Sequence, residues 1–446
     1  MKKCVLDTNV VLDRTLKNII DGFNEPTEVI LPLVMLEELD TFKKGYEIKN
    51  VNARSANNFL DELRGHGELH KGVKYGKHIV KVTVDIADLD LGKVDYKIIN
   101  TAKEHDAVLI TQDINERVIA DAVGVESTHY RHDDVDAETL YTGVCVCDIS
   151  DEDIEDFINK KYIRTNTVMR EGSEYELHHN EFVIMKDSQG GESEGIFDAE
   201  SGTIQPLQRN YEAFGINPKR DTKGTLIQEQ KFLMHLLLDK DTDFVSAIGP
   251  SGIGKTFITL AVALQKMLKE QEYSRIVVMR PLIPIGQEIG HLPGDKREKL
   301  SPWMASTTDN LEALLAEETF NRDNDCVSAR EVVEAMMDSG QLEFEGISFI
   351  RGRSIPQQFI IVDDAQNLTV QEATTIITRA GEGSKVVFLG DLSEKQIDNH
   401  RLTPSSNGLA YAVDRLHGSV GIGHISTLDE SKVVRSRLAR LGVEKL

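Results

Sequence analysis

The sequence predicts an α/β fold, with a parallel-sheet domain at each end of the chain and a smaller β-rich segment between them. Apolar runs alternate with helix-period stretches in the first and last parts, and polar or acidic residues end these runs. In the middle part, Gly-rich turns separate short alternating runs. The length of 446 residues is enough for three domains.

The first part, residues 1–145, contains three apolar runs that read as strands. They are residues 2–7 (KKCVLD), 28–32 (EVILP) and 107–113 (AVLITQD), and each ends in a polar or acidic residue or in proline. Residues 33–44 follow the helical period. Strands that alternate with helices predict a parallel α/β sheet.

The middle part, residues 146–222, reads as a short helix over 150–162 followed by short runs with Gly-rich turns over 180–202. This pattern predicts a small antiparallel β unit that connects two larger domains. Pro and Gly near residues 214–224 mark the boundary with the last part, residues 223–446. That part again alternates helices with strands, which we expect at 244–248, 275–280, 358–364 and 385–391.

Composition limits the class of protein. The chain has 51 Lys and Arg against 74 Asp and Glu, a net charge of −23, which argues against a polybasic nucleic-acid coat. We expect a cytoplasmic protein, because no charge-free run has the length of a membrane helix and Asp7 and Asp13 interrupt the place of a signal peptide's apolar segment. The four scattered cysteines favour free thiols over a zinc site.

The strongest motif is GPSGIGKT at residues 249–256, which fits G-x-x-x-x-G-K-[ST] between a predicted strand and a predicted helix. Its backbone N–H groups and the helix N-terminus favour phosphate, Lys255 is expected to reach the β and γ phosphates, and Thr256 is expected to bind Mg²⁺. The sequence therefore predicts an ATP site made by Gly249, Pro250, Ser251, Gly252, Ile253, Gly254, Lys255, Thr256 and Phe257.

Two later strands end in polar residues that suit the same site. Residues 358–367 (QFIIVDDAQN) supply Asp363 for the Mg²⁺ shell and Asp364 to orient or deprotonate the attacking water. The strand that ends at Gly390 and Asp391 is followed by Gln396, which is placed to sense the γ phosphate. Such strand ends meet at one sheet edge, where α/β proteins bind ligands.

These motifs resemble the PhoH-like ATPases, relatives of the superfamily-one helicases, over residues 214–440: GPSGIGKT, DDAQN, GDLSEKQID, RGRS and the run from Met279 to Met304. The resemblance implies that Gln230 reads the adenine edge. The family usually has Glu where this chain has Asp364, and the shorter Asp364 side chain leaves its role as a base open. The family also usually has R-G-R-T where this chain has RGRS.

An arginine supplied by a neighbouring subunit neutralises transition-state charge in many ATPases. The candidates are Arg280, Arg351, Arg353 and Arg435, and we select Arg435. An arginine that acts in trans requires an oligomer.

The first part carries carboxylates on separate predicted elements. Asp7 follows the first strand and precedes Thr8 and Asn9, and the other candidates are Glu37 or Glu38, Asp95 and Asp113. Grouped carboxylates hold Mg²⁺ or Mn²⁺, ions that activate water for phosphodiester cleavage. The order LDTNV, LEELD, a helix-opening Asp and T-x-D resembles the PIN-domain nucleases over residues 1–140. The resemblance implies a metal cluster of Asp7, Glu38, Asp95 and Asp113, in which Glu38 is preferred to Glu37 for its E-L-D match.

A PIN-like nuclease joined to a PhoH-like ATPase resembles the ring proteins that unwind and cleave RNA. The resemblance implies an ATP-dependent RNA helicase and endoribonuclease, hexameric, with ATP, Mg²⁺ and single-stranded RNA as its ligands. Two alternatives stay open: an ATP-regulated nuclease that unwinds nothing, and an RNA-binding ATPase whose nuclease domain is degenerate. Because the chain is acidic, RNA contacts are expected at local basic clusters, at residues 296–299, Arg351 with Arg353, and 432–440.

Overall fold

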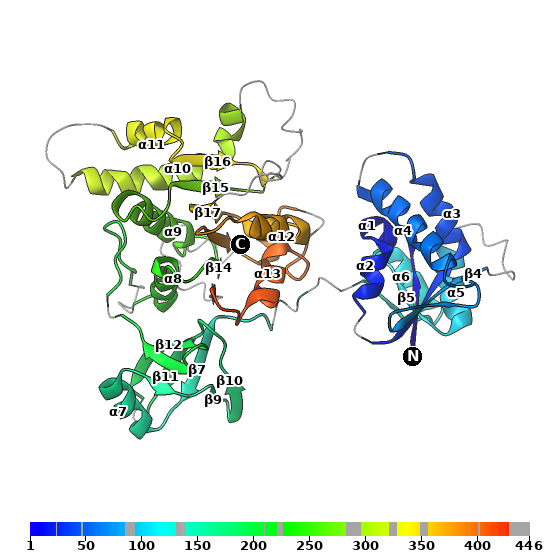
Figure 1. Cartoon of the computed structure of the whole chain (residues 1–446), viewed down its shortest axis with the longest axis horizontal. Helices are drawn as coiled ribbons and strands as arrows, with labels where there is room; N and C mark the ends of the chain where they lie inside the picture. The colour runs from blue at the N-terminus through cyan, green and yellow to red at the C-terminus, as the bar shows by residue number, and fades with distance from the viewer. Residues whose placement is uncertain are drawn as a thin grey trace. The chain divides into compact units, whose positions relative to one another are not determined.

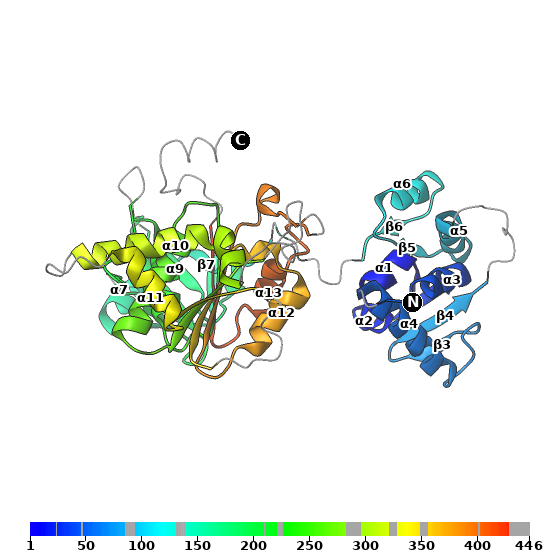
Figure 2. The ribbon, with the colours of Figure 1, turned by 90° about the horizontal axis from the view of Figure 1, so that it is seen from above.

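The computed structural model describes residues 1–23, 25–45, 48–84, 94–130, 135, 137, 139–188, 190–208, 210–220, 226–281, 296–320, 328–347, 356–399 and 402–427. The chain forms two compact units, residues 1–132 and residues 133–446. Figure 1 and Figure 2 give two views of the ribbon.

The first unit is built on a six-stranded sheet with the order β3-β4-β2-β1-β5-β6. Its strands are β1 (Lys2–Leu6), β2 (Thr27–Pro32), β3 (Val73–Tyr75), β4 (His78–Thr83), β5 (Val108–Ile110) and β6 (Ser127–Thr128). Every neighbouring pair is parallel except β3 with β4. The α/β fold predicted for this part is confirmed.

Helices cover both faces of this sheet because successive strand side chains point to opposite sides. Leu6 and Leu31 pack with the helices α1 to α4, whereas Val5 and Ile30 pack with α5 and α6. The helices in the described part of this unit are α1 (Thr8–Asp13), α2 (Leu16–Asp21), α3 (Leu33–Thr41), α4 (Ile48–Arg64), α5 (Val94–His105) and α6 (Ile114–Ala122).

The second unit begins with a seven-stranded sheet of order β10-β9-β7-β11-β12-β13-β8. Its elements are β7 (Val144–Asp148), α7 (Asp151–Lys160), β8 (Ile163–Arg164), β9 (Thr167–Arg170), β10 (Ser173–Glu176), β11 (Phe182–Lys186), β12 (Glu192–Asp198) and β13 (Thr203–Pro206). The expectation of purely antiparallel pairing is wrong for β7 and β11, which run parallel. The short runs reveal strands but not their directions, because α7 and three strands separate β7 from β11 along the chain.

One face of this β sheet packs on α7 through Phe157, Val183 and Phe197. The opposite face meets helix α8 (Gln228–Leu238), where the rings of Phe182 and Phe232 stack with centroids 4.2 Å apart. The β sheet and the following α/β sheet therefore share a hydrophobic core.

The third sheet is wholly parallel and has the order β16-β15-β17-β18-β14-β19. Its strands are β14 (Phe244–Ile248), β15 (Arg275–Met279), β16 (Leu342–Glu345), β17 (Gln358–Val362), β18 (Lys385–Gly390) and β19 (Ile422–Ser426). All residues of β14, β17 and β18 are buried, as expected for a parallel sheet with helices on both faces.

Val245 and Ile276 pack on one side of this sheet with α8, α9 (Lys255–Leu264), α10 (Lys296–Phe320) and α11 (Ala329–Asp338). Phe244 and Val277 pack on the other side with α12 (Val370–Arg379) and α13 (Gly408–Leu416). Figure 1 shows these two helical layers. The described residues also form short helices at η1 (Gln265–Lys269), η4 (Ala365–Asn367) and η5 (Glu394–Gln396).

Two predictions from composition concern these folded parts. Among the described residues, no helix has both the length and the apolar character of a membrane span. Cys4, Cys145 and Cys147 are buried free thiols, as predicted. Cys326 lies outside the described residues.

Candidate nucleotide site and candidate nuclease site

The loop of residues 249–254 joins β14 to α9 and forms a cradle for phosphate. Gly252 and Gly254 have φ angles of +91° and +97°, in the region that favours glycine. The Lys255 ammonium donates to the carbonyl of Gly249 at 2.5 Å and to that of Pro250 at 3.1 Å. Lys255 therefore lies along the loop, at the positive N-terminus of α9.

Thr256 and Asp363 meet across the sheet edge. The Thr256 hydroxyl lies 3.2 and 3.3 Å from the two carboxylate oxygens of Asp363, which follows β17. Burial raises the pKa of the Asp363 carboxyl, and the neighbouring Asp364 raises it further, while Arg280 and Lys255 oppose both effects. A hydroxyl and a carboxylate at this place are the groups that hold Mg²⁺ in phosphate-loop sites.

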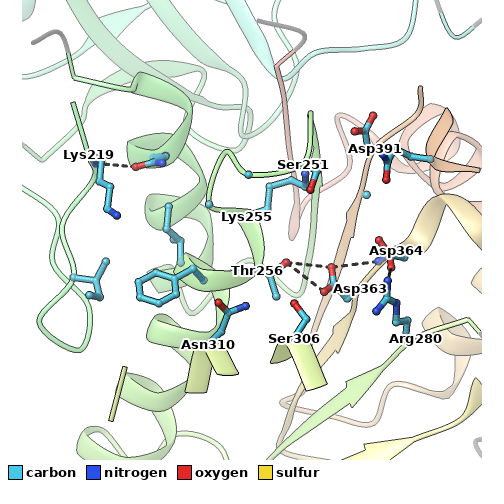
Figure 3. Close-up of a pocket in the computed structure, with 18 of the residues that line it drawn as sticks. Lys219, Ser251, Lys255, Thr256, Arg280, Ser306, Asn310, Asp363, Asp364 and Asp391 are labelled. Carbon is cyan, nitrogen blue, oxygen red and sulfur yellow. Dashed lines mark hydrogen bonds and ion pairs between the residues drawn. The ribbon is translucent and has the colours of Figure 1, made fainter. Parts of the chain in front are cut away.

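Asp364 has a left-handed backbone with φ of 52°, which Asp tolerates better than most residues. Its carboxylate forms an ion pair with Arg280, at the end of β15 in the same chain (Figure 3). Arg280 was a candidate for the arginine that acts in trans, and here it binds a carboxylate of its own chain.

A cavity of about 440 Å³ lies between these groups. Figure 3 shows that Lys255 and Thr256 line its middle and that Asp363, Asp364 and Asp391 lie at one end. Of the residues expected from the sequence, the cavity is lined by Gln230, Ser251, Gly252, Gly254, Lys255, Thr256, Phe257, Arg280, Asp363, Asp364, Gly390, Asp391 and Gln396.

Other lining residues were missed in the sequence. Ile216, Asn217 and Lys219 belong to the stretch read as a domain boundary, and their only sequence signal is that they lie shortly before the loop. Ser306 and Asn310 lie one helical turn apart on α10, and Figure 3 places both at the cavity. Their spacing of four was a usable signal, but only a folded chain shows which helix face meets the loop.

Gln230 uses both ends of its amide within the chain. Its nitrogen donates to the carbonyl of Ile253 at 2.7 Å, and its oxygen accepts from the N–H of Lys219 at 2.7 Å. The side chain is only 4% exposed. Gln230 therefore ties the phosphate loop to the segment of Lys219, and its contact with adenine stays a prediction.

The first unit places its carboxylates around Asp7, at the start of α1. The Asp7 carboxylate accepts from the backbone N–H of Thr8 at 2.5 Å. The hydroxyl of Thr8 donates to Glu38 on α3, also at 2.5 Å. Thr8 therefore connects the carboxylates of Glu38 and Asp7. Asp7 directly follows the carboxyl end of β1.

Thr111, which directly follows β5, is the centre of this network. Its hydroxyl accepts from the Asn9 amide at 3.2 Å and from the N–H of Asp113 at 3.1 Å. The same oxygen lies 2.7 Å from Asp7 and 2.5 Å from Glu116. A hydroxyl has one hydrogen, so it can donate to only one of the two carboxyl groups. The second of these carboxyl groups must therefore carry a proton of its own or share a bound cation.

Glu116, on α6, was missed in the sequence. It is 2% exposed, and its second carboxyl oxygen has no hydrogen-bond partner among the described residues. Burial raises its pKa to about 9, with further contributions from Asp7 and Asp95. The signal in the sequence was Glu three residues after Asp113 at the start of a helix, where acidic residues are also common for capping reasons alone.

The other predicted carboxylates hold local positions. Asp113 is the N-cap of α6 and accepts from the N–H of Asn115 at 2.8 Å. Asp95 lies in the first turn of α5, and its charge acts on Glu116. Among the described residues, no three His, Cys, Asp or Glu side chains stand in the arrangement of a metal site. Carboxylate and hydroxyl oxygens are the donors that Mg²⁺ and Mn²⁺ take, so the residue types around Asp7 suit such an ion, and its binding stays a prediction.

Several candidates lie outside the described residues, namely Arg351, Arg353, Arg435 and residues 432–440. Residues 296–299 form the start of α10, but their side chains are likewise outside the described set.

Comparison with known proteins divides the chain in the same way. Residues 224–445 match the family model described as PhoH-like protein, and residues 4–131 match the PIN domain. Protein PhoH2 of Bacillus subtilis is 36% identical over 99% of each chain. The chain belongs to the PhoH2 family. Protein PhoH2 of Thermobispora bispora is 30% identical, over 99% of this chain and 96% of the relative, and Protein PhoH2 of Mycolicibacterium smegmatis is 29% identical over the same shares.

The family confirms the predicted architecture of a PIN nuclease fused to a PhoH-like ATPase. The PhoH2 relatives align along almost their whole length, so the similarity also spans the segment between the two matched ranges. Both kinds of domain generally use ATP or divalent metals, which agrees with the chemistry of the two sites.

Proposed function

We propose that the chain is an ATP-driven RNA helicase and a metal-dependent endoribonuclease, in which a ring of ATPase domains feeds single-stranded RNA to the nuclease site. One observation carries the proposal: a phosphate loop with its Thr256–Asp363 contact and a carboxylate network around Thr111 occur on one polypeptide. Two active sites joined in this way act on a shared substrate at high effective concentration.

In the ATPase half, Lys255 leaves the loop carbonyls and binds the β and γ phosphates. Thr256 and Asp363 would hold Mg²⁺, an ion that would supply neutralisation of charge on the phosphates. Asp364 takes a proton from the attacking water, whose oxygen bonds to the γ phosphorus as the bond to the ADP oxygen breaks. Gln396 and an arginine from the neighbouring subunit, for which Arg435 is our candidate, stabilise the charge that develops.

In the nuclease half, Asp7, Glu38, Asp95 and Asp113 would hold Mg²⁺ or Mn²⁺, and Glu116 would add a fifth carboxyl. A divalent ion held there would activate water for attack on an RNA phosphorus, and the bond from that phosphorus to the leaving ribose oxygen would break. Thr8 and Thr111 orient the carboxylates through their hydroxyl groups, which leaves few rotamers to be ordered when the ion binds.

The proposal also includes a ring and a path for RNA. The resemblance implies a hexamer, and an arginine that acts in trans requires an oligomer. RNA would contact the basic residues at 296–299, Arg351, Arg353 and 432–440, since the chain as a whole carries −23. Binding should weaken steeply with salt, as expected for a few backbone phosphate contacts.

An unwinding assay tests this function. The substrate is a labelled RNA duplex with an unpaired tail, and the protein carries Asp7→Asn so that cleavage cannot break the duplex. We expect the strands to separate with ATP, but not with a non-hydrolysable analogue and not in the Lys255→Ala variant.

Two outcomes would favour the alternatives. If ATP is hydrolysed while the duplex stays paired, the chain is an ATP-regulated nuclease without unwinding activity. If the duplex opens but the unaltered chain does not cleave single-stranded RNA in Mg²⁺ or Mn²⁺, the nuclease domain only binds RNA.

A further inference from the structure

Two consecutive buried amides, Gln366 and Asn367, connect the end of β17 to the loop that follows β18. Gln366 is 1% exposed and Asn367 is 3% exposed. Neither belongs to the predicted set of nucleotide ligands. The loop they contact, residues 391–399, brings Asp391 and Gln396 to the nucleotide cavity.

Gln366 binds both ends of its amide to different groups. The oxygen accepts from the N–H of Asp391 at 3.1 Å, so the nitrogen must face the other way. That nitrogen donates to the backbone carbonyl of Gln396 at 3.0 Å, and it lies 3.4 Å from a carboxylate oxygen of Asp364. One side chain therefore contacts the candidate base, the start of the loop and the residue placed to sense the γ phosphate.

Asn367 holds the far end of the same loop. Its oxygen accepts from the N–H of Asp398 at 2.8 Å and from that of Asn399 at 3.2 Å. Together the two amides bind four main-chain groups of the loop.

The loop needs such anchors because its middle is exposed. Ser393, Glu394, Lys395 and Gln396 all have exposed side chains, so packing alone does not fix their place. Gly390 shows how closely the parts approach: a Cβ there would lie 2.7 Å from the Gln366 oxygen and 2.4 Å from Leu409. Only glycine allows the strand end and the amide to meet at this distance.

We propose that Gln366 and Asn367 are positioning residues for ATP hydrolysis, which hold the loop of residues 391–399 so that Gln396 and Asp364 face the γ phosphate together. The proposal rests on the ATP hydrolysis assigned to this site above. It separates two properties of the cavity: the phosphate loop binds the nucleotide, and the two amides align the groups that act on its last phosphate.

Steady-state hydrolysis of Mg-ATP by the full chain tests this division. Gln366→Met has a similar length but lacks both polar ends, and it should lower kcat about 100-fold, since small misplacements of reacting groups have effects of this size. KM for ATP and the dissociation constant of a fluorescent ADP should change less than about threefold, because the ground-state contacts remain. The matched control is Gln371→Met, the same change at an exposed residue of α12, which should leave kcat unaltered.

Asn367 supplies a second, independent test. Asn367→Leu removes the oxygen that accepts from the loop and should lower kcat. Asn367→Asp keeps that oxygen, so its kcat should be about tenfold higher than that of Asn367→Leu. Rescue by Asp is not expected if Asn367 merely fills space, since the side chains of Leu and Asp have the same branching and the same number of heavy atoms as that of Asn.

Three outcomes overturn the inference. The first is a normal kcat in Gln366→Met. The second is a parallel loss of ADP affinity and kcat in that variant, which would indicate general damage to the site. The third is the absence of rescue by Asn367→Asp. The proposed function fails in a different way: the unaltered chain would bind ADP and yet hydrolyse no ATP, and both proposals would then fall.

Discussion

The two candidate sites both lie where parallel strands end, but their carboxylates are balanced by different groups. At the nucleotide site Asp364 is paired with Arg280, and Arg280 and Lys255 both act to lower the pKa of Asp363. At the nuclease site the groups around Asp7 are hydroxyls and amides, and the charges that act on Glu116 are those of Asp7 and Asp95.

The difference indicates what each site needs from outside. Lysine and arginine of the chain itself partly compensate Asp363 and Asp364, so the nucleotide site holds its carboxylates in place before Mg-ATP arrives. The nuclease network has one hydrogen for two carboxyl groups at Thr111, so its carboxylates require a proton or a bound cation. We expect metal to be part of the folded nuclease site and to arrive with the substrate at the ATPase site.

The largest expected effect is the loss of RNA cleavage in Asp7→Asn. The change removes one charge from the network while keeping its shape, and it should lower metal-dependent cleavage of single-stranded RNA at least about 1,000-fold. ATP turnover should stay normal because it uses other residues. Gel analysis of a labelled RNA in Mn²⁺ measures RNA cleavage, and phosphate release measures ATP turnover. Undiminished cleavage would contradict the site assignment.

Lys255→Ala should have the opposite pattern, with ATP hydrolysis lost and cleavage of unpaired RNA retained. It removes the cation that contacts the phosphates, and ATP hydrolysis should fall about 1,000-fold. Cleavage of RNA that is already unpaired should persist, whereas cleavage of RNA that must first be unwound should stop. If cleavage of unpaired RNA also stops, the two sites are coupled more tightly than their separate networks indicate.

The next effect concerns pH and metal at Glu116. With its pKa raised to about 9, this carboxyl keeps its proton in the folded, metal-free unit over a range in which the unfolded chain has released it. The folded state therefore binds the additional proton between the ordinary pKa of Glu and about 9, and the stability of the unit should fall as pH rises through that range.

Hydrogen exchange of α1 and β5, corrected for the intrinsic dependence on pH, measures this stability in a chelator at about pH 6 and about pH 8. Glu116→Gln should weaken the dependence on pH, and Mn²⁺ should protect the unaltered chain more at the higher pH. RNA cleavage by Glu116→Gln should fall about 100-fold. If the stability of Glu116→Gln depends on pH as strongly as that of the unaltered chain, another group causes the dependence.

A smaller effect is expected from Arg280→Gln. The ion pair with Asp364 orients the candidate base, so its loss should lower kcat for ATP about 20-fold while ADP binds normally. Addition of the unaltered protein to form mixed oligomers should not restore the activity of Arg280→Gln sites if Arg280 acts within its own chain. Restoration in mixed oligomers would instead identify Arg280 as the arginine that acts in trans.

The smallest effect is expected from Gln230→Ala. Because both amide ends bind main-chain groups, the change should weaken ATP and GTP binding alike, by about fivefold. Competition against a fluorescent ADP compares the two nucleotides. A selective loss of ATP binding would show that the amide reads adenine, as the resemblance implies.

Local patterns were enough for several parts of this molecule. The phosphate loop is continuous in sequence, and its glycines, Lys255 and Thr256 act through local backbone geometry, so the motif and its neighbouring strand and helix could be predicted together. The same holds for the alternation of strands and helices, because burial on both faces of a parallel sheet leaves a continuous apolar run for each strand.

Contacts between distant residues were not available from such patterns. The parallel pairing of β7 with β11, the approach of Glu116 to Asp7, and the faces of α10 that carry Ser306 and Asn310 depend on which elements become neighbours. Gln366 and Asn367 belong to a motif visible in the sequence, yet their role rests on a loop about thirty residues later.

The sequence by itself determined that this chain has a phosphate loop, carboxylates at strand ends and two α/β units, because strand and helix periods and backbone conformation are local properties. Only the tertiary structure decided which groups balance those carboxylates: lysine and arginine at one site, threonine hydroxyls and amides at the other. The physical reason is that the charge and burial that shift a pKa depend on distance in space, which neighbours in the sequence do not specify.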